Sequence, residues 1–182
     1  MATAIENIMV TQAFPELEEV FRANQACVLK AAYRVTGSMA DAEDVLQSVF
    51  LRLARGTVDT DRISNLQSYL HRSAVNAALD LIRSRGHREL VPVETADDLQ
   101  TDPSLSPERA ASSLEIKNWL RRELAKLNPR AAEMFALRYL EGLDNPEIAR
   151  AMNTSQAVVA VTLHRTRARL KKSLRDLRKG AS

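Results

Sequence analysis

Apolar residues recur three and four positions apart along most of the chain, with polar residues between them. This period matches the α-helical turn, whereas a half-buried strand would alternate at every second residue. The pattern predicts helices over residues 15–37, 38–55 and 64–85. Gly37 is expected to end the first of them, and Ser38 and Ser64 are expected to cap the starts of the next two. After an interval it resumes with helices that start at Pro107 and Pro129, each proline suiting the first helical position.

The last two helices flank a tight turn near the C-terminus. Asn145 is a suitable N-cap for the first of them, and Pro146 follows where its missing N–H is not needed. Asn153 tolerates the left-handed conformation of a helix end, and Thr154 or Ser155 then caps the second helix. This pattern is typical of a helix-turn-helix, whose second helix enters the major groove of DNA. An ordinary αα-hairpin has the same pattern.

Composition favours an all-α protein built from two small helical domains. The 182 residues are 45% hydrophobic and include only 5 Gly and 6 Pro, so few helix breakers interrupt the pattern. Residues 91–106 contain prolines and acidic side chains without periodicity, which indicates a linker. We therefore expect a first domain over residues 15–90 and a second domain, ending in the helix-turn-helix, over residues 107–178.

The net charge of +3 conceals an uneven distribution. Residues 165–179 hold eight Lys or Arg and one acid, whereas residues 94–115 hold six acids and one base. A basic C-terminal helix suggests contact with nucleic-acid phosphates, and an acidic middle segment would stay away from them. A merely solvated terminal helix would show the same run of charge.

No pattern in the sequence points to catalysis, a cofactor or a metal. His71, His87 and His164 have no cysteine or HExxH companion, and no glycine-rich phosphate loop is present. The single cysteine, Cys27, lies on an apolar helical stripe and is expected to be a packed thiol. Because we find neither a signal peptide nor an apolar stretch of membrane-spanning length, we expect a cytoplasmic protein that is not an enzyme.

The helix over residues 38–55 carries a candidate protein-binding surface. Its first turn is acidic, and an aromatic residue lies partly outside its apolar face. Such a surface suits a protein interface, although helix capping plus one spare core aromatic explains the same pattern equally well. The residues concerned are Asp41, Asp44, Gln47, Phe50 and Leu51.

The helix over residues 64–85 has a polar edge opposite its apolar stripe. Arg72, Asn76, Asp80 and Arg83 follow one another at spacings of four, four and three. Arg and Asn in line can follow a phosphate backbone and bond an exposed base edge. A solvated face on which Arg and Asp pair has the same spacing.

These elements, in this order, resemble the extracytoplasmic-function (ECF) sigma factors of bacterial RNA polymerase. The family's second region resembles residues 41–53, DAEDVLQSVFLRL, and its melting region resembles residues 68–83, SYLHRSAVNAALDLIR. Its fourth region is similar to residues 127–149, which include FALRYLEGL. Three segments in the family's order, with a linker between the second and third, make the resemblance specific. It covers nearly all of residues 15–176.

The resemblance implies an alternative sigma factor that directs promoter recognition, melting and transcription initiation. It implies as partners core RNA polymerase, through the clamp helices of its largest subunit and its flap, promoter DNA and an anti-sigma factor. The residues that match the core-binding surface are Asp41, Asp44, Gln47, Phe50 and Leu51. Asn76 matches the asparagine that holds a flipped non-template base of the proximal promoter element. The full proximal set is Arg72, Asn76, Asp80, Arg83, Arg85 and Arg88.

The recognition helix departs from the family's pattern. The family usually has Gly-Thr-Val followed by polar or basic residues, whereas residues 157–161 read AVVAV. Hydrogen-bond donors are therefore missing from the groove-facing side, but alanine and valine can contact thymine methyl groups. We expect upstream readout to use phosphate contacts, DNA shape and the remaining polar residues. These are Thr154, Ser155, Gln156, Thr162, His164, Arg165 and Arg167.

Two other functions fit part of the sequence. A helix-turn-helix regulator acting without core polymerase would leave residues 38–90 unexplained. A sigma-mimicking protein that sequesters an anti-sigma factor would explain the apolar recognition helix, but it would not explain the basic run after His164.

Overall fold

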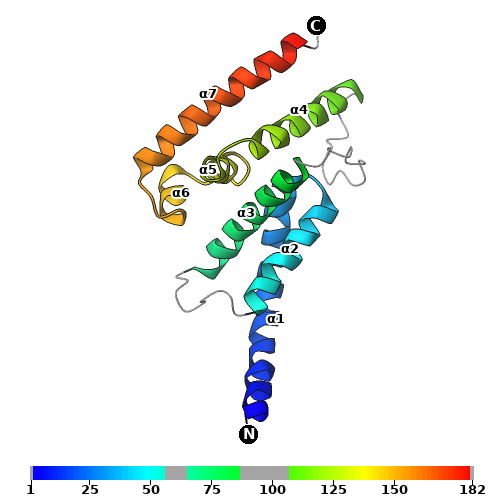
Figure 1. Cartoon of the computed structure of the whole chain (residues 1–182), viewed down its shortest axis with the longest axis vertical. Coiled ribbons are helices and arrows are strands. Elements are labelled where there is room, and N and C mark those ends of the chain that lie inside the picture. The colour runs from blue at the N-terminus through cyan, green and yellow to red at the C-terminus, as the bar shows by residue number, and fades with distance from the viewer. Residues whose placement is uncertain (1, 56–64, 87–106, 181–182) are drawn as a thin grey trace.

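The computed structural model describes residues 2–55, 65–86 and 107–180, and every element in these ranges is a helix (Figure 1). The prediction of an all-α fold is confirmed for this part of the chain. The helices are α1 (Ala2–Thr36), α2 (Met39–Ala54), α3 (Leu66–Gly86), α4 (Pro107–Ala125), α5 (Pro129–Tyr139), α6 (Asn145–Ala151) and α7 (Gln156–Gly180).

The first three helices pack together along their apolar stripes. Val28, Val45, Leu70 and Val75 are buried where α1, α2 and α3 meet. The prediction that the first helix begins at Pro15 is wrong, because α1 begins at Ala2. Proline removes one helical hydrogen bond, but it does not prevent the residues on both sides from continuing the helix.

Capping residues set the boundaries of α1, α2 and α3. Gly37 ends α1 at a φ of +68°, and the Ser38 side chain accepts the Asp41 N–H at 3.3 Å to start α2, both as predicted. Asn65 caps α3 by accepting the Ser68 N–H at 2.9 Å. The predicted capping residue of this helix, Ser64, lies outside the described residues.

In the second half of the chain, the start of α6 differs from the prediction. Asp144, and not Asn145, is the N-cap: it accepts the Glu147 N–H at 2.8 Å, while the Glu147 carboxylate accepts the Asp144 N–H at 2.7 Å. This reciprocal capping box satisfies two backbone donors, which a cap at Asn145 would not do. The turn itself is as predicted, with Asn153 at a φ of +46° and Ser155 accepting the Val158 N–H at 3.3 Å.

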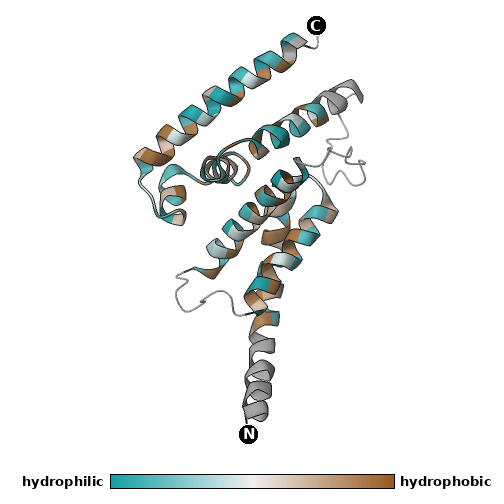
Figure 2. Ribbon diagram, viewed as in Figure 1, coloured by the Kyte–Doolittle hydropathy of each residue, from teal (hydrophilic) through white to brown (hydrophobic). Residues whose placement is uncertain are grey.

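Helix α3 connects the two halves of the molecule. It contacts α1 and α2 on one side and α4, α5 and α6 on the other (Figure 1). Figure 2 shows apolar segments of α2 and α3 facing inward, whereas α7 is largely hydrophilic with an apolar patch at its N-terminal end. The polar edge of α3 is therefore placed beside the second half of the chain. The predicted linker, residues 91–106, lies in the part of the chain that the structure does not describe.

Candidate nucleic-acid and polymerase interfaces

The polar edge of α3 is bonded to a carboxylate of α5. Arg72 Nε and Asn76 Nδ2 donate to the same oxygen, Glu133 Oε1, at 2.5 and 2.9 Å. Arg72 Nη1 also donates to the carbonyl oxygen of Ala151, at the end of α6, at 2.6 Å. Glu133 is buried. The structure thus brings Arg72 and Asn76 together as the sequence predicts, and it engages Arg72 Nε, Arg72 Nη1 and Asn76 Nδ2 with groups of the same chain.

A cleft of about 440 Å³ lies beside this contact. Asp80 and Arg83 line it together with Arg72 and Asn76, so all four residues of the predicted polar edge share one site. Arg83 Nη1 donates to Asp80 Oδ1 at 2.8 Å, the pairing expected of a solvated helix face. Arg130, opposite them on α5, adds a positive charge to the cleft.

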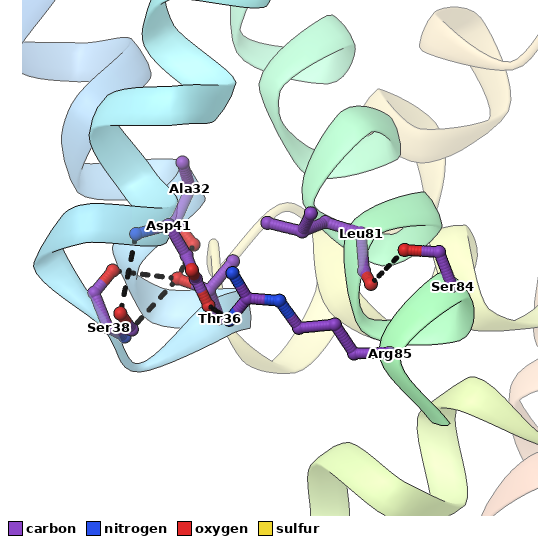
Figure 3. Close-up of polar contacts among 7 residues, drawn as sticks. All are labelled: Ala32, Thr36, Ser38, Asp41, Leu81, Ser84 and Arg85. Carbon is purple, nitrogen blue, oxygen red and sulfur yellow. Dashed lines mark hydrogen bonds and ion pairs between the residues drawn. The ribbon is translucent and has the colours of Figure 1, made fainter. Parts of the chain in front are cut away.

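Arg85, at the end of α3, is engaged within the first three helices. Figure 3 shows it reaching across to Asp41 at the start of α2, where Nη1 and Oδ2 are 2.5 Å apart. Asp41 is only 5% exposed, so its carboxylate needs such a partner. One residue predicted for the polymerase surface therefore pairs with one predicted for the DNA surface. Arg88, also predicted to bind DNA, lies outside the described residues.

The candidate protein-binding surface of α2 is smaller than the sequence suggests. Asp44 and Gln47 are exposed, and Leu51 is 52% exposed, at spacings of three and four that place them on one face. For Phe50 the sequence left an exposed interface aromatic and a spare core aromatic equally open, and the structure shows the core aromatic. It is buried and packs edge to face on Phe21, with ring centroids 4.8 Å apart.

The N-terminal turns of α7 present an apolar exposed face. Val158 and Val161 are 46% and 49% exposed, and Arg165, also exposed, follows at the next helical spacing. The opposite side of the helix carries the fully buried Val159, and α7 packs against α6. This face therefore points away from the core, as the recognition helix of a helix-turn-helix requires.

The polar residues predicted for upstream readout are spread over different surroundings. Gln156 and Arg165 are exposed, Thr154 and Thr162 are half-buried, and Ser155 is used as the cap of α7. Only part of the predicted set therefore shares the exposed face with Val158 and Val161.

His164 and Arg167 line a groove of about 690 Å³ between α4, α5 and α7. Its walls are largely apolar, with Trp119 and Tyr139 among them, and Lys171 adds a further positive charge. Tyr139 remains 45% exposed there. The two predicted DNA-binding residues thus lie on the basic rim of an apolar groove.

Three residues that the sequence did not single out shape these surfaces. Glu133 and Glu141 are carboxylates within or just after an apolar helix, where neither caps a helix start, and that position is the only sequence signal for them. Arg121 of α4 lies against Gly37, and burial lowers the pKa of its guanidinium. Burial, with Glu141 nearby, raises the pKa of the Cys27 thiol.

The described residues contain neither a metal-binding cluster nor a helix suited to crossing a membrane. No group of three or more His, Cys, Asp or Glu in these ranges could hold a metal ion. Among the helices described, none combines the length and apolarity that crossing a membrane requires.

Comparisons with known proteins match both halves of the chain. The model of Sigma-70 region 2 matches residues 20–88, and that of Sigma-70, region 4 matches residues 117–170. The RNA polymerase sigma-E factor of Streptomyces avermitilis is 33% identical over 165 residues, covering 89% of this chain and 88% of that protein. The ECF RNA polymerase sigma factor SigW of Bacillus subtilis is 28% identical over 173 residues, covering 91% and 90%.

A solved structure supports the fold. The structure of CnrH in complex with the cytosolic domain of CnrY matches with a TM-score of 0.54 at 22% identity, covering 93% of this chain and 96% of that one. The two sigma-70 regions occur in the expected order, over helices whose exposed faces suit protein and DNA contacts. The chain belongs to the ECF sigma factors, which bind core RNA polymerase and direct transcription initiation at promoters.

Proposed function

We propose that the chain acts in the cytoplasm by binding alone, while core polymerase supplies the catalysis. Its first domain, residues 15–90, captures the melted proximal promoter element, and its second, residues 107–178, holds the upstream element. The observation that carries this proposal is the convergence of Arg72 and Asn76, one turn apart on α3, on a single acceptor oxygen. A phosphate oxygen or a base carbonyl offers the same kind of acceptor to these donors.

Strand capture offsets the cost of opening the duplex. Unstacking a base costs a few kcal/mol, and hydrogen bonds to the extruded base recover part of it. Asn76 is assigned to the flipped base, because an amide can both donate to and accept from a base edge. Arg72 and Arg83 flank it on α3 and are assigned to the neighbouring phosphates.

Core polymerase is assigned to the exposed face of α2. Asp44, Gln47 and Leu51 combine a charge, an amide and an apolar side chain on one face, as protein interfaces do. Asp41 and Phe50 support this face from below: one fixes α2 to Arg85, the other to Phe21. Their replacement would act through the position of α2.

The upstream element is assigned to the exposed face of α7. Val158 and Val161 would lie in the major groove, where the thymine methyl group is the apolar feature that they can contact. Arg165 would bind a phosphate beside them. We therefore propose that the preferred upstream element carries thymine at the positions facing these two valines.

The groove between α4, α5 and α7 is assigned to the flap of the polymerase. Its apolar walls and its rim of His164, Arg167 and Lys171 suit an amphipathic segment with acidic residues. CnrH, which shares the fold, was solved in complex with the cytosolic domain of CnrY. We propose that an anti-sigma factor binds this chain as well and competes with polymerase.

The test of the proposed function is transcription in vitro with core polymerase and genomic fragments that include the DNA upstream of the chain's own gene. Discrete transcripts that disappear with Asn76→Ala and with Asp44→Arg are expected. Asn76→Ala should leave core binding intact. Asp44→Arg should weaken it, because a polymerase surface that complements the Asp44 carboxylate would then face a like charge, which costs several kcal/mol.

The matched control is Glu115→Arg, the same charge reversal at an exposed glutamate of α4. It should transcribe normally. Core binding without any transcript would favour a sigma-mimicking protein, and specific duplex binding without core binding would favour a helix-turn-helix regulator. Either result would overturn the proposed function.

A further inference from the structure

We infer that the described arrangement is a closed state, in which the second domain blocks the strand-binding edge of α3 and Glu133 takes the place of DNA. The inference rests on the proposed function of Arg72 and Asn76. Both donate to Glu133 Oε1, so the Arg72 Nε–H and one N–H of the Asn76 amide are not available to a phosphate or a base while this contact holds. A carboxylate accepts hydrogen bonds and carries negative charge, as a phosphate does.

The bond from Arg72 to α6 strengthens the closed state. Its Nη1 donates to the carbonyl of Ala151, in the last turn of α6. The carbonyls of a last helical turn have no partner within the helix and attract positive charge. One arginine of the predicted DNA-binding edge therefore joins two helices of the other domain, and its Nε and Nη1 donors have to leave these acceptors before they can bind DNA.

A second ion pair holds the same interface at the other end of α5. Glu141 Oε2 accepts from Arg34 of α1 at 3.0 Å and lies 2.7 Å from His71 Nε2 of α3. The Glu141 side chain is only 3% exposed. Glu133 and Glu141 thus each link the second domain to basic or polar residues of the first, and we call these two carboxylates with their partners the closing contacts.

The closing contacts are incompletely satisfied, which suits a reversible state. Glu141 Oε1 is buried and has no hydrogen-bond partner among the residues that the structure describes. A buried acceptor without a partner carries a desolvation penalty that exposure to water would remove. Opening therefore recovers part of what it loses at this interface, and a modest binding energy from a partner can drive it.

The closed state leaves the proposed docking face of α2 free. Asp44, Gln47 and Leu51 are exposed while Glu133 covers the edge of α3. Core polymerase can therefore engage α2 first, and opening follows as the two domains take separate positions on it. In this order the free chain would not capture single strands. The contacts that hold a melted promoter would therefore form only after polymerase has bound.

The test measures shape and strand binding of the full-length chain. Small-angle X-ray scattering should give a larger radius of gyration for Glu133→Gln/Glu141→Gln than for the parent. Fluorescence anisotropy with a labelled single-stranded oligonucleotide of mixed sequence should show about tenfold tighter binding, if the open form is about a tenth of the parent population. Adding Asn76→Ala should remove the gain.

The control is Glu123→Gln, which removes another buried carboxylate whose ion pair, with Lys126, stays within the second domain. It should change neither measurement. An unchanged radius of gyration in the double variant, or a gain in affinity that survives Asn76→Ala, would overturn the inference. Failure of the proposed function is seen separately, as normal transcription by Asn76→Ala in the presence of core polymerase.

Discussion

The edge of α3 and the exposed face of α7 are both assigned to DNA, yet the structure leaves them in opposite conditions. On α3, Arg72 and Asn76 are bonded to Glu133. On α7, Val158 and Val161 are about half exposed and face away from the core. A polar surface can be satisfied by groups of its own chain, whereas an apolar surface without a partner stays open to water.

The difference sets the order in which the two surfaces can act. A site whose competent form is only a fraction of the population binds more weakly by that fraction, while an open site binds with its full affinity. The free chain should therefore meet duplex DNA through α7, and strand capture through α3 should wait for opening. Substitutions that affect one of these two surfaces and leave the other intact test this order most directly.

The largest effect is expected from Gly37→Val, at the contact between the first domain and α4. Gly37 has a φ of +68°, and a Cβ there would lie 1.6 Å from Arg121 Nη2 of the second domain. Left-handed backbone costs a non-glycine residue about 1–2 kcal/mol, and displacing the half-buried guanidinium, the far end of a flexible side chain, adds a smaller amount. We expect the melting temperature, followed by circular dichroism, to fall by about 2–8 °C.

Gly142→Val is the matched control for this prediction. Gly142 has a φ of +79°, but a Cβ there would meet no atom within 4 Å. Its melting temperature should fall only by the amount that backbone strain causes. Adding Arg121→Ala to Gly37→Val should restore only the part of the fall that exceeds this amount. Equal losses at the two glycines would mean that Arg121 does not press on α1, and the closed arrangement would lose that support.

The next effect concerns the exposed face of α7 and its contacts with thymine methyl groups. Each thymine of a selected upstream element is replaced by deoxyuridine, which lacks only the methyl group. Burial of a methyl group contributes about 0.8 kcal/mol or more, so binding should weaken about four- to tenfold at the contacted positions. The affinity of the chain with core polymerase, measured by anisotropy, checks this.

Val158→Ala/Val161→Ala supplies the control. It should bind the thymine element as weakly as the parent binds the deoxyuridine element, and it should be indifferent to the replacement. Persistent sensitivity to the thymine methyl group in this variant would refute the valine contacts. Loss of sensitivity with unchanged strand capture would confirm that the two surfaces are independent.

Local features of the fold could be predicted from the sequence because they depend on neighbouring residues. Gly37, Asn153 and Ser155 end or start helices through backbone geometry and short hydrogen bonds, and the sequence predicts all three. The cap of α6 was misplaced by one residue, because Asp144 and Asn145 are both good caps and only the reciprocal bond with Glu147 decides between them.

The covered site could not be predicted, because it depends on contacts between distant residues. Spacing places Arg72 and Asn76 on one edge of a helix, but it does not reveal that Glu133, 57 residues after Asn76, lies opposite them. Phe50 shows the same limit: its side chain could face solvent or core until the position of Phe21 is known. Candidate residues follow from periodicity, and their partners follow only from tertiary packing.

A smaller effect distinguishes the surfaces by their dependence on salt. Arg165→Ala should reduce the slope of log affinity against log salt by about 0.9 for duplex DNA, the contribution of one phosphate contact. Arg72→Ala should leave that slope unchanged in the free chain, because Arg72 is bonded to Glu133 and Ala151. Equal changes in slope for the two variants would mean that α3 is already open to DNA.

The smallest effect is a chemical report on the closed interface from Cys27. Burial, and then the charge of Glu141, raise the pKa of this thiol, so less of it is thiolate at a given pH. Because the folded pKa lies above the unfolded one, folding is opposed as the pH rises through the thiol's ordinary range.

Glu141→Gln removes one of the causes of the raised pKa and should speed alkylation of Cys27 by iodoacetamide about two- to threefold at pH 8. Opening of the interface would act in the same direction, whereas Glu123→Gln should leave the rate unchanged. An alkylation rate that does not respond to Glu141→Gln would place Glu141 away from Cys27 in solution, and the second of the closing contacts would then be absent from the free chain.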